Sequence, residues 1–261
     1  MPLTPETPPV ERTIITMARR DRMVTIAGLT VAMFVAWAHI LSGAGMQMDM
    51  PGMKAGVSGF GYFLMMFPMW FIMMVAMMLP SATPMILLFA AISRKQRERG
   101  APFASTGMFT LGYLSVWGVF SIGATVLQWV LGSAEIIQHS LSVNNPAVSA
   151  ILLSGAGLWQ LTPVKRACLE HCRAPVHYLT AHWRKGQFGA LRMGLQHGAF
   201  CLGCCWFLMG LLFIGGIMNL YWIIGIAVYV LLEKLVPNGQ ILARTSGMML
   251  IGAGVWLGFS A

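Results

Sequence analysis

The amino-acid sequence predicts an all-α fold, a polytopic bundle of about seven transmembrane helices. Of the 261 residues, 57% are hydrophobic and only 10% are charged, whereas a soluble domain carries about 25% charged residues. Apolar runs of about 18 residues or more recur, and each can cross a hydrocarbon core of roughly 30 Å as a helix. A backbone in lipid must satisfy its own hydrogen bonds, so these runs are predicted as helices rather than as isolated strands.

The N-terminal segment, residues 1–22, is rich in Pro and Thr and ends in a basic cluster. We expect this segment to be disordered and cytoplasmic. The apolar run that follows, residues 23–43, is longer than the roughly 7–15-residue apolar core of a secretory signal peptide. We therefore predict that this run is a retained first span, and that residues 23–261 form a single transmembrane helical domain.

The later spans follow from the alternation of apolar runs with turn-rich or basic connections. Residues 45–59 contain several turn-forming residues and are predicted as a loop. Pro80 and Pro84 lie within the second span and predict kinks, because proline removes a backbone donor and clashes one turn back. The predicted spans cover about residues 23–43, 66–92, 106–131, 147–163, 194–218, 221–236 and 242–261.

The distribution of Lys and Arg predicts the orientation of the chain. With seven spans, sixteen of the seventeen basic residues lie on one side of the membrane, and only Lys54 lies on the other. Because cytoplasmic loops carry the excess of basic residues, the predicted topology is N-in and C-out, in the inner membrane of a bacterium. The formal charge of +9 does not indicate nucleic-acid binding, because the basic residues cluster beside the spans.

All five cysteines fall in two short segments near the predicted cytoplasmic ends of the fourth and fifth spans. If both segments are helical, spacings of three, four and seven residues gather thiols and imidazoles into one stripe on each helix. Such groups bind soft or borderline metal ions, although lone cysteines also pack as small apolar residues. The cytoplasmic side is reducing, so disulfides are not expected. The predicted metal ligands are Cys168, His171, Cys172, His197, Cys201, Cys204 and Cys205.

Methionine is concentrated in one part of the chain, with twelve of the 22 methionines between Met46 and Met85. Thioethers are soft ligands that suit Cu(I), although methionine also fills gaps in helix packing. A set in the 45–59 loop is predicted to capture metal on the outer side: Met46, Met48, Met50 and Met53. A helical stripe in the second span is predicted as a path for the ion: Met69, Met73, Met77 and Met78.

Two polar residues near the cysteine segments are candidates for orienting the metal ligands. Glu233 is predicted to hydrogen-bond His197 or His171, as groups outside the coordination sphere commonly do. The other account of Glu233, with its neighbour Lys234, is anchoring at the membrane interface. Gln160 is predicted either to support the ligands or to join helices through its amide.

Several motifs carry a resemblance to a known family. They are the run Trp70–Ser81, the run Gln160–Lys165 with the first cysteine segment after it, Gly203–Trp206, and Glu233 with Lys234. Together they resemble a bacterial family of polytopic proteins described as predicted metal-binding integral membrane proteins. The resemblance covers most of the chain from the second span onward, and it implies metal binding without defining a function.

Three functions are consistent with these features. In the favoured one, the protein binds Cu(I) or a similar soft ion and passes or buffers it, using Met ligands outside and Cys/His ligands near the cytoplasmic face. In the second, a structural zinc site makes the protein a scaffold or an assembly factor. In the third, it is a subunit of a membrane oxidoreductase, with iron as another candidate metal. No catalytic motif is recognised, so an enzyme is not favoured; the expected partners are the lipid bilayer and either a soluble metal carrier or a second copy of the chain.

Overall fold

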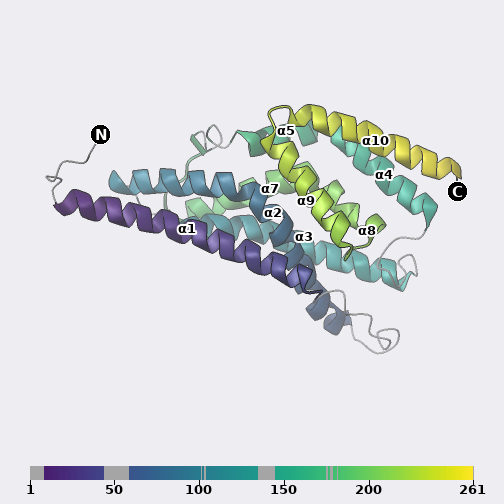
Figure 1. The fold of residues 1–261 in the computed structure, drawn as a ribbon, viewed down its shortest axis with the longest axis horizontal. Coiled ribbons are helices and arrows are strands. Elements are labelled where there is room, and N and C mark those ends of the chain that lie inside the picture. The colour runs from purple at the N-terminus through teal and green to yellow at the C-terminus, as the bar shows by residue number, and fades with distance from the viewer. Residues whose placement is uncertain are drawn as a thin grey trace.

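The computed structural model describes residues 9–43, 59–100, 102, 104–134, 145–174, 176, 179–180 and 182–260, with side chains from residue 23 onward. The predicted all-α fold is confirmed, because these residues form helices and no strand (Figure 1). The helices are α1 (Pro9–Leu41), α2 (Gly59–Glu98), α3 (Thr106–Ser133), α4 (Pro146–Leu161), α5 (Pro163–Arg173), α7 (Gly186–Gly210), α8 (Leu212–Gly215), α9 (Leu220–Leu235) and α10 (Gly239–Ser260).

Within the described residues, five helical stretches are long and apolar enough to cross a membrane, and α4 with α5 makes a sixth if the bent pair counts as one span. These stretches are compatible with a membrane protein. Helix α9 has only 16 residues, a rise of about 24 Å, so the count of seven spans stays a prediction. The start of α1 and the end of α10 lie at opposite ends of the long axis (Figure 1), as an odd number of crossings would place them.

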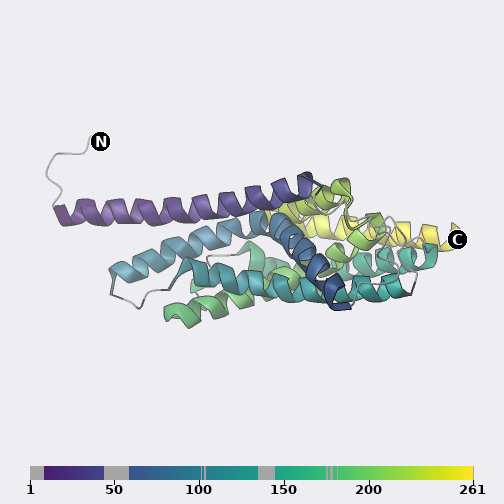
Figure 2. The same ribbon diagram turned by 90° about the horizontal axis from the view of Figure 1, so that it is seen from below.

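Two helices differ in extent or shape from a simple span. Helix α1 begins at Pro9, so it extends into the segment that we expected to be disordered; proline is favoured in the first helical turn, and no Gly or Pro follows before Met23. Helix α2 is continuous over 40 residues but changes direction between its two halves (Figures 1 and 2). Pro80 and Pro84 lie close to its midpoint, where the prolines predicted a kink.

The predicted fourth span is divided into two helices at Thr162. This residue is the C-cap of α4 and the N-cap of α5, and its side chain accepts a hydrogen bond from the backbone N–H of Lys165 at 3.2 Å. Pro163 then occupies the first position of α5, where its missing N–H costs no hydrogen bond. The two helices meet at 63°, so α5 turns aside and packs against α7.

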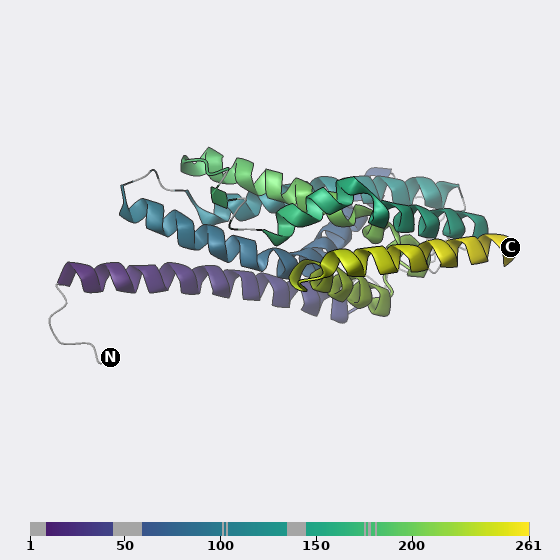
Figure 3. The ribbon, with the colours of Figure 1, turned by 90° about the horizontal axis from the view of Figure 1, so that it is seen from above.

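The helices pair out of chain order, α3 with α7 and α4 with α10. Glycines permit both contacts. A Cβ added to Gly112 of α3 would overlap the backbone of α7 at Leu191, and one added to Gly157 of α4 would lie 2.6 Å from the carbonyl oxygen of Gly247 in α10. Small residues that let backbones approach closely are typical of helix pairs in membranes. Figure 3 shows α10 extending beside α4.

The interior of the bundle is built around α2. Trp70 and all of its methionines except Met65 are almost completely buried, and the indole N–H of Trp70 donates to Gln128 of α3 at 2.6 Å. Helix α2 also contacts α1 and α9. One face of α2 therefore meets the end of α9 and the middle of α7, where the cysteines lie.

We predict that Gly112→Ala destabilises the protein and Gly123→Ala does not. Both glycines lie in α3, but a Cβ at Gly112 meets the backbone of α7, whereas a Cβ at Gly123 meets nothing within 4 Å. Overpacking of a close contact costs about 1–3 kcal/mol, while alanine in an open helical position gains up to about 1 kcal/mol. Thermal unfolding of the detergent-purified variants measures the difference, and an equal melting temperature for both would contradict the close packing of α3 on α7.

Candidate metal site

Four thiols meet where α5 packs against α7. Cys201, Cys204 and Cys205 lie on one side of α7 and are fully buried, and Cys172 of α5 interacts with the thiols of Cys201 and Cys204. The α7 thiols adjoin one another as well, since Cys205 interacts with both Cys201 and Cys204. All five cysteines of the chain are free thiols.

The α7 thiols are held by the carbonyl oxygen of Cys201. The Sγ atoms of Cys204 and Cys205 each donate to this oxygen at 3.0 Å. The i+3 and i+4 spacing of the two donors brings both back to the same turn of the helix. The sulfur atoms are therefore positioned by the helix itself.

A thioether joins the thiols from α2. The Sγ of Cys205 lies 3.9 Å from the Sδ of Met78, which is itself fully buried. A thiolate sulfur binds zinc at about 2.3 Å, so two sulfurs on one ion of similar size lie roughly 3.8–4.0 Å apart at ligand angles of 110–120°. The spacing of these two sulfurs is compatible with neighbouring ligands on one metal ion, and it is also that of an S–H···S hydrogen bond.

Two polar groups lie against Cys201. The ammonium of Lys234, at the end of α9, donates to the Sγ of Cys201 at 3.0 Å and to the hydroxyl of Ser81 at 3.0 Å. The hydroxyl of Tyr113 lies 3.2 Å from the same Sγ and donates to the carbonyl oxygen of Met78 at 3.1 Å. Helices α2, α3, α7 and α9 thus all meet at this sulfur.

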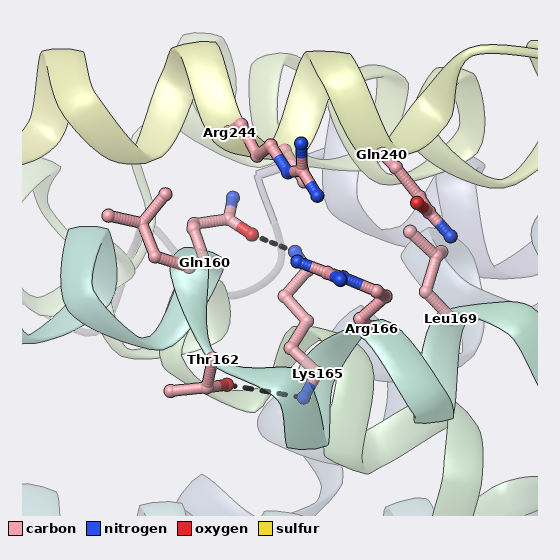
Figure 4. Close-up of a pocket in the computed structure, with 9 residues that line it drawn as sticks. Gln160, Thr162, Lys165, Arg166, Leu169, Gln240 and Arg244 are labelled. Carbon is pink, nitrogen blue, oxygen red and sulfur yellow. Dashed lines mark hydrogen bonds between the residues drawn. The ribbon is translucent and has the colours of Figure 1, made fainter.

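A buried ion pair adjoins the thiol cluster. Lys165 Nζ of α5 lies 2.6 Å from Glu233 Oε1 of α9, and both side chains are at most 1% exposed. Lys165 also donates to the side-chain carbonyl of Gln160, as Figure 4 shows. The amide of Gln160 donates in turn to Tyr229 at 3.0 Å. Glu233 therefore pairs with Lys165, and its predicted role in orienting His197 or His171 stays a prediction.

Figure 4 also shows how α10 closes this region. Gln240 and Arg244 extend from α10 toward Arg166 and Leu169 of α5. The cavity that they line has a volume of about 10 Å³, about the space of one water molecule. The ion pair is thus enclosed by α4, α5, α9 and α10 and is shielded from bulk solvent.

The remaining predicted ligands lie beside the cluster rather than within it. Cys168 is half-buried and faces Gly203 of α7. The ring of His171 stacks on Phe200 at 4.0 Å between centroids, and the ring of His197 stacks on Tyr113 at 5.6 Å. Aromatic stacking orients both imidazole rings, which helical spacing alone does not reveal.

The predicted methionine path is buried along α2. Met69, Met73, Met77 and Met78 are each at most 6% exposed and belong to the main core. Of these, Met78 contacts the thiol of Cys205. The predicted capture set, Met46, Met48, Met50 and Met53, lies outside the described residues.

The thiols lie next to one another but do not form a complete coordination shell for a metal ion. Among the described His, Cys, Asp and Glu side chains, no group of three or more is arranged to hold a metal ion. Methionine is not one of these residue types. Two of the thiols, Cys201 and Cys205, together with the thioether of Met78 would give a donor set of three sulfurs. Cu(I) accepts soft ligands in low number, and thiolate with thioether suits it.

Two lysines of the site were not predicted from the sequence. Lys165 was assigned to a basic connection and Lys234 to the membrane interface, where long side chains usually extend to water. Both are buried, at 1% and 7% exposure. The sequence feature that could have identified Lys234 is its place, with Glu233, directly after an apolar run. Charged residues inside a membrane are functional candidates by default.

The fold and the site together define a helical protein, compatible with a membrane, whose interior holds a soft-ligand cluster. A family model described as "PpoB2: Copper chaperone" matches residues 67–257, and the chain belongs to this family. A search of curated proteins and a search of solved structures each give no match. The family supports a copper-related role, which agrees with the metal binding that the sequence motifs implied, although it is described as a copper chaperone family rather than as predicted metal-binding integral membrane proteins.

We predict that Lys165→Met or Glu233→Gln alone destabilises the protein by about 3–5 kcal/mol, because each leaves an uncompensated polar or charged group in the interior. The double variant Lys165→Met/Glu233→Gln removes both charges and should recover most of this loss. Thermal unfolding of the three variants measures the coupling. Additive losses in the double variant would show that the two side chains do not interact.

Proposed function

We propose that this protein binds Cu(I) inside the bundle, through the thiolates of Cys201 and Cys205 and the thioether of Met78. The observation that carries the proposal is the 3.9 Å separation of the Cys205 and Met78 sulfurs, contributed by two different helices. Cys201 adjoins Cys205 on the same face of α7. The copper family of the chain and the preference of Cu(I) for soft sulfur ligands support this metal over zinc or iron.

In this proposal the copper is cargo that the protein passes on or buffers in the bacterial inner membrane. Met69, Met73 and Met77 are buried in α2 and form a line of thioethers that leads to Met78. Such sites bind weakly enough for an ion to leave each one, as conduction requires. The loop methionines at 46–53 would supply ions to this line from the outer side.

Cys172 provides the exit in the same proposal. It lies on α5, the short helix that turns aside from α4, and it interacts with Cys201 and Cys204. A thiol on a separate short helix can accept the ion by ligand exchange. A soluble metal carrier on the predicted cytoplasmic side would be the recipient.

The test is the Cu(I) affinity of purified variants, measured by competition with a chromophoric Cu(I) chelator. Met78→Leu and Cys205→Ser should each weaken Cu(I) binding at least tenfold, because each removes a sulfur ligand. Met74→Leu is the matched control for Met78, since both methionines lie in α2 and are fully buried. Cys168→Ser is the control for Cys205. Equal affinities in Met78→Leu and Met74→Leu would contradict the site.

A structural zinc site or an electron-carrying metal gives a different result in the same samples. Elemental analysis of the membrane-extracted protein for Cu, Zn and Fe distinguishes the three. Zinc at one ion per chain that resists chelation would favour a scaffold. A visible chromophore with iron would favour an oxidoreductase subunit.

A further inference from the structure

The buried charged side chains near the thiols do not balance one another. Lys165 and Glu233 form one neutral pair, but Lys234 carries a further positive charge at 7% exposure. Its hydrogen bonds go to Ser81 and Cys201, and no carboxylate of the described residues pairs with it. A buried charge is costly unless it is compensated, so the anion that balances Lys234 must come from sulfur.

The surroundings of Lys234 support this conclusion. The thiol of Cys201 accepts a hydrogen bond from the ammonium of Lys234 at 3.0 Å. Glu233 is adjacent in the chain, yet its Oε1 faces Lys165, and its Oε2 is buried without a hydrogen-bond partner. The carboxylate is therefore turned toward α5, and the ammonium toward α7.

We propose that Lys234 is the built-in counter-cation of the metal complex and makes the site selective for monovalent soft ions. This inference rests on the proposed copper site. A monovalent ion between the thiolates of Cys201 and Cys205 forms a complex with one negative charge, and the Lys234 ammonium neutralises it. A divalent ion on the same two thiolates forms a neutral complex, which leaves Lys234 uncompensated.

A third thiolate would restore neutrality around a divalent ion. Among the described residues, no group of three His, Cys, Asp and Glu side chains could hold a metal ion, so the other thiols of the cluster do not join Cys201 and Cys205 as ligands. The thioether of Met78 lies 3.9 Å from the thiol of Cys205; it is neutral and adds no charge. Two thiolates, one neutral thioether and one ammonium together carry one negative charge, so an ion of charge +1 makes the site neutral.

The experiment compares Ag(I) with Hg(II), two soft ions that both accept two sulfur ligands and differ by one charge. The full chain in detergent is dialysed against each ion in a glutathione buffer, and bound metal is measured by elemental analysis. In Lys234→Met, the affinity for Ag(I) should fall at least tenfold, whereas the affinity for Hg(II) should stay the same or rise. The ratio of the two affinities therefore changes at least tenfold.

Two further variants separate charge from shape. Lys234→Gln retains a hydrogen-bond donor without the charge and should shift the ratio as Lys234→Met does. Lys234→Arg retains the charge and should keep the wild-type ratio. Undiminished Hg(II) binding by a variant shows that its thiols are still assembled.

An unchanged ratio of the Ag(I) and Hg(II) affinities in Lys234→Met and Lys234→Gln would overturn the proposal, because a purely structural lysine affects the binding of both ions alike. Failure of the copper site itself has a separate signature: wild-type protein and Cys205→Ser would then bind Ag(I) equally weakly. The two hypotheses are thus tested independently in one set of samples.

Discussion

The buried salt bridge between Lys165 and Glu233 is the contact on which the geometry of the thiols depends. It joins α5 to α9 in the interior, and these are the helices that contribute Cys172 and Lys234. Two charged side chains removed from water are stable only when further hydrogen bonds satisfy them. Lys165 donates one of these to the side-chain carbonyl of Gln160. With Glu233 held by α5, the next residue along α9 is directed at Cys201.

A sulfur site buried in this way has consequences for how an ion leaves it. The three α7 thiols and Met78 are all fully buried, so water cannot assist in displacing a ligand. In the proposed site, exchange would therefore proceed from one sulfur to another, and the accepting thiol would come from an element that can shift. Helix α5 is 11 residues long and joins α4 at a 63° bend, which makes it the element best suited to that part.

The helical class and the thiol-bearing faces were predictable because both follow from periodicity. Long apolar runs predict helices in lipid, and the spacing of Cys201, Cys204 and Cys205 predicts a common face. Periodicity does not identify what a face meets. His197 is in phase with the cysteines but stacks on Tyr113. Lys165 and Lys234 are near span ends, where exposure is usual; Lys165 is buried where α5 meets Glu233 of α9, and Lys234 where α9 meets α2 and α7.

Because the helices pair out of chain order, the fold cannot be completed until the last helix has been synthesised. Helix α4 packs along α10, and α3 along α7, so each early segment must wait for a partner that is synthesised later. Helix α5 with its cysteine follows directly from α4, and Ser246 of α10 lies 2.6 Å from Tyr229 of α9. Synthesis therefore has to reach α10 before α4 and α9 gain the partner that they have in the folded chain.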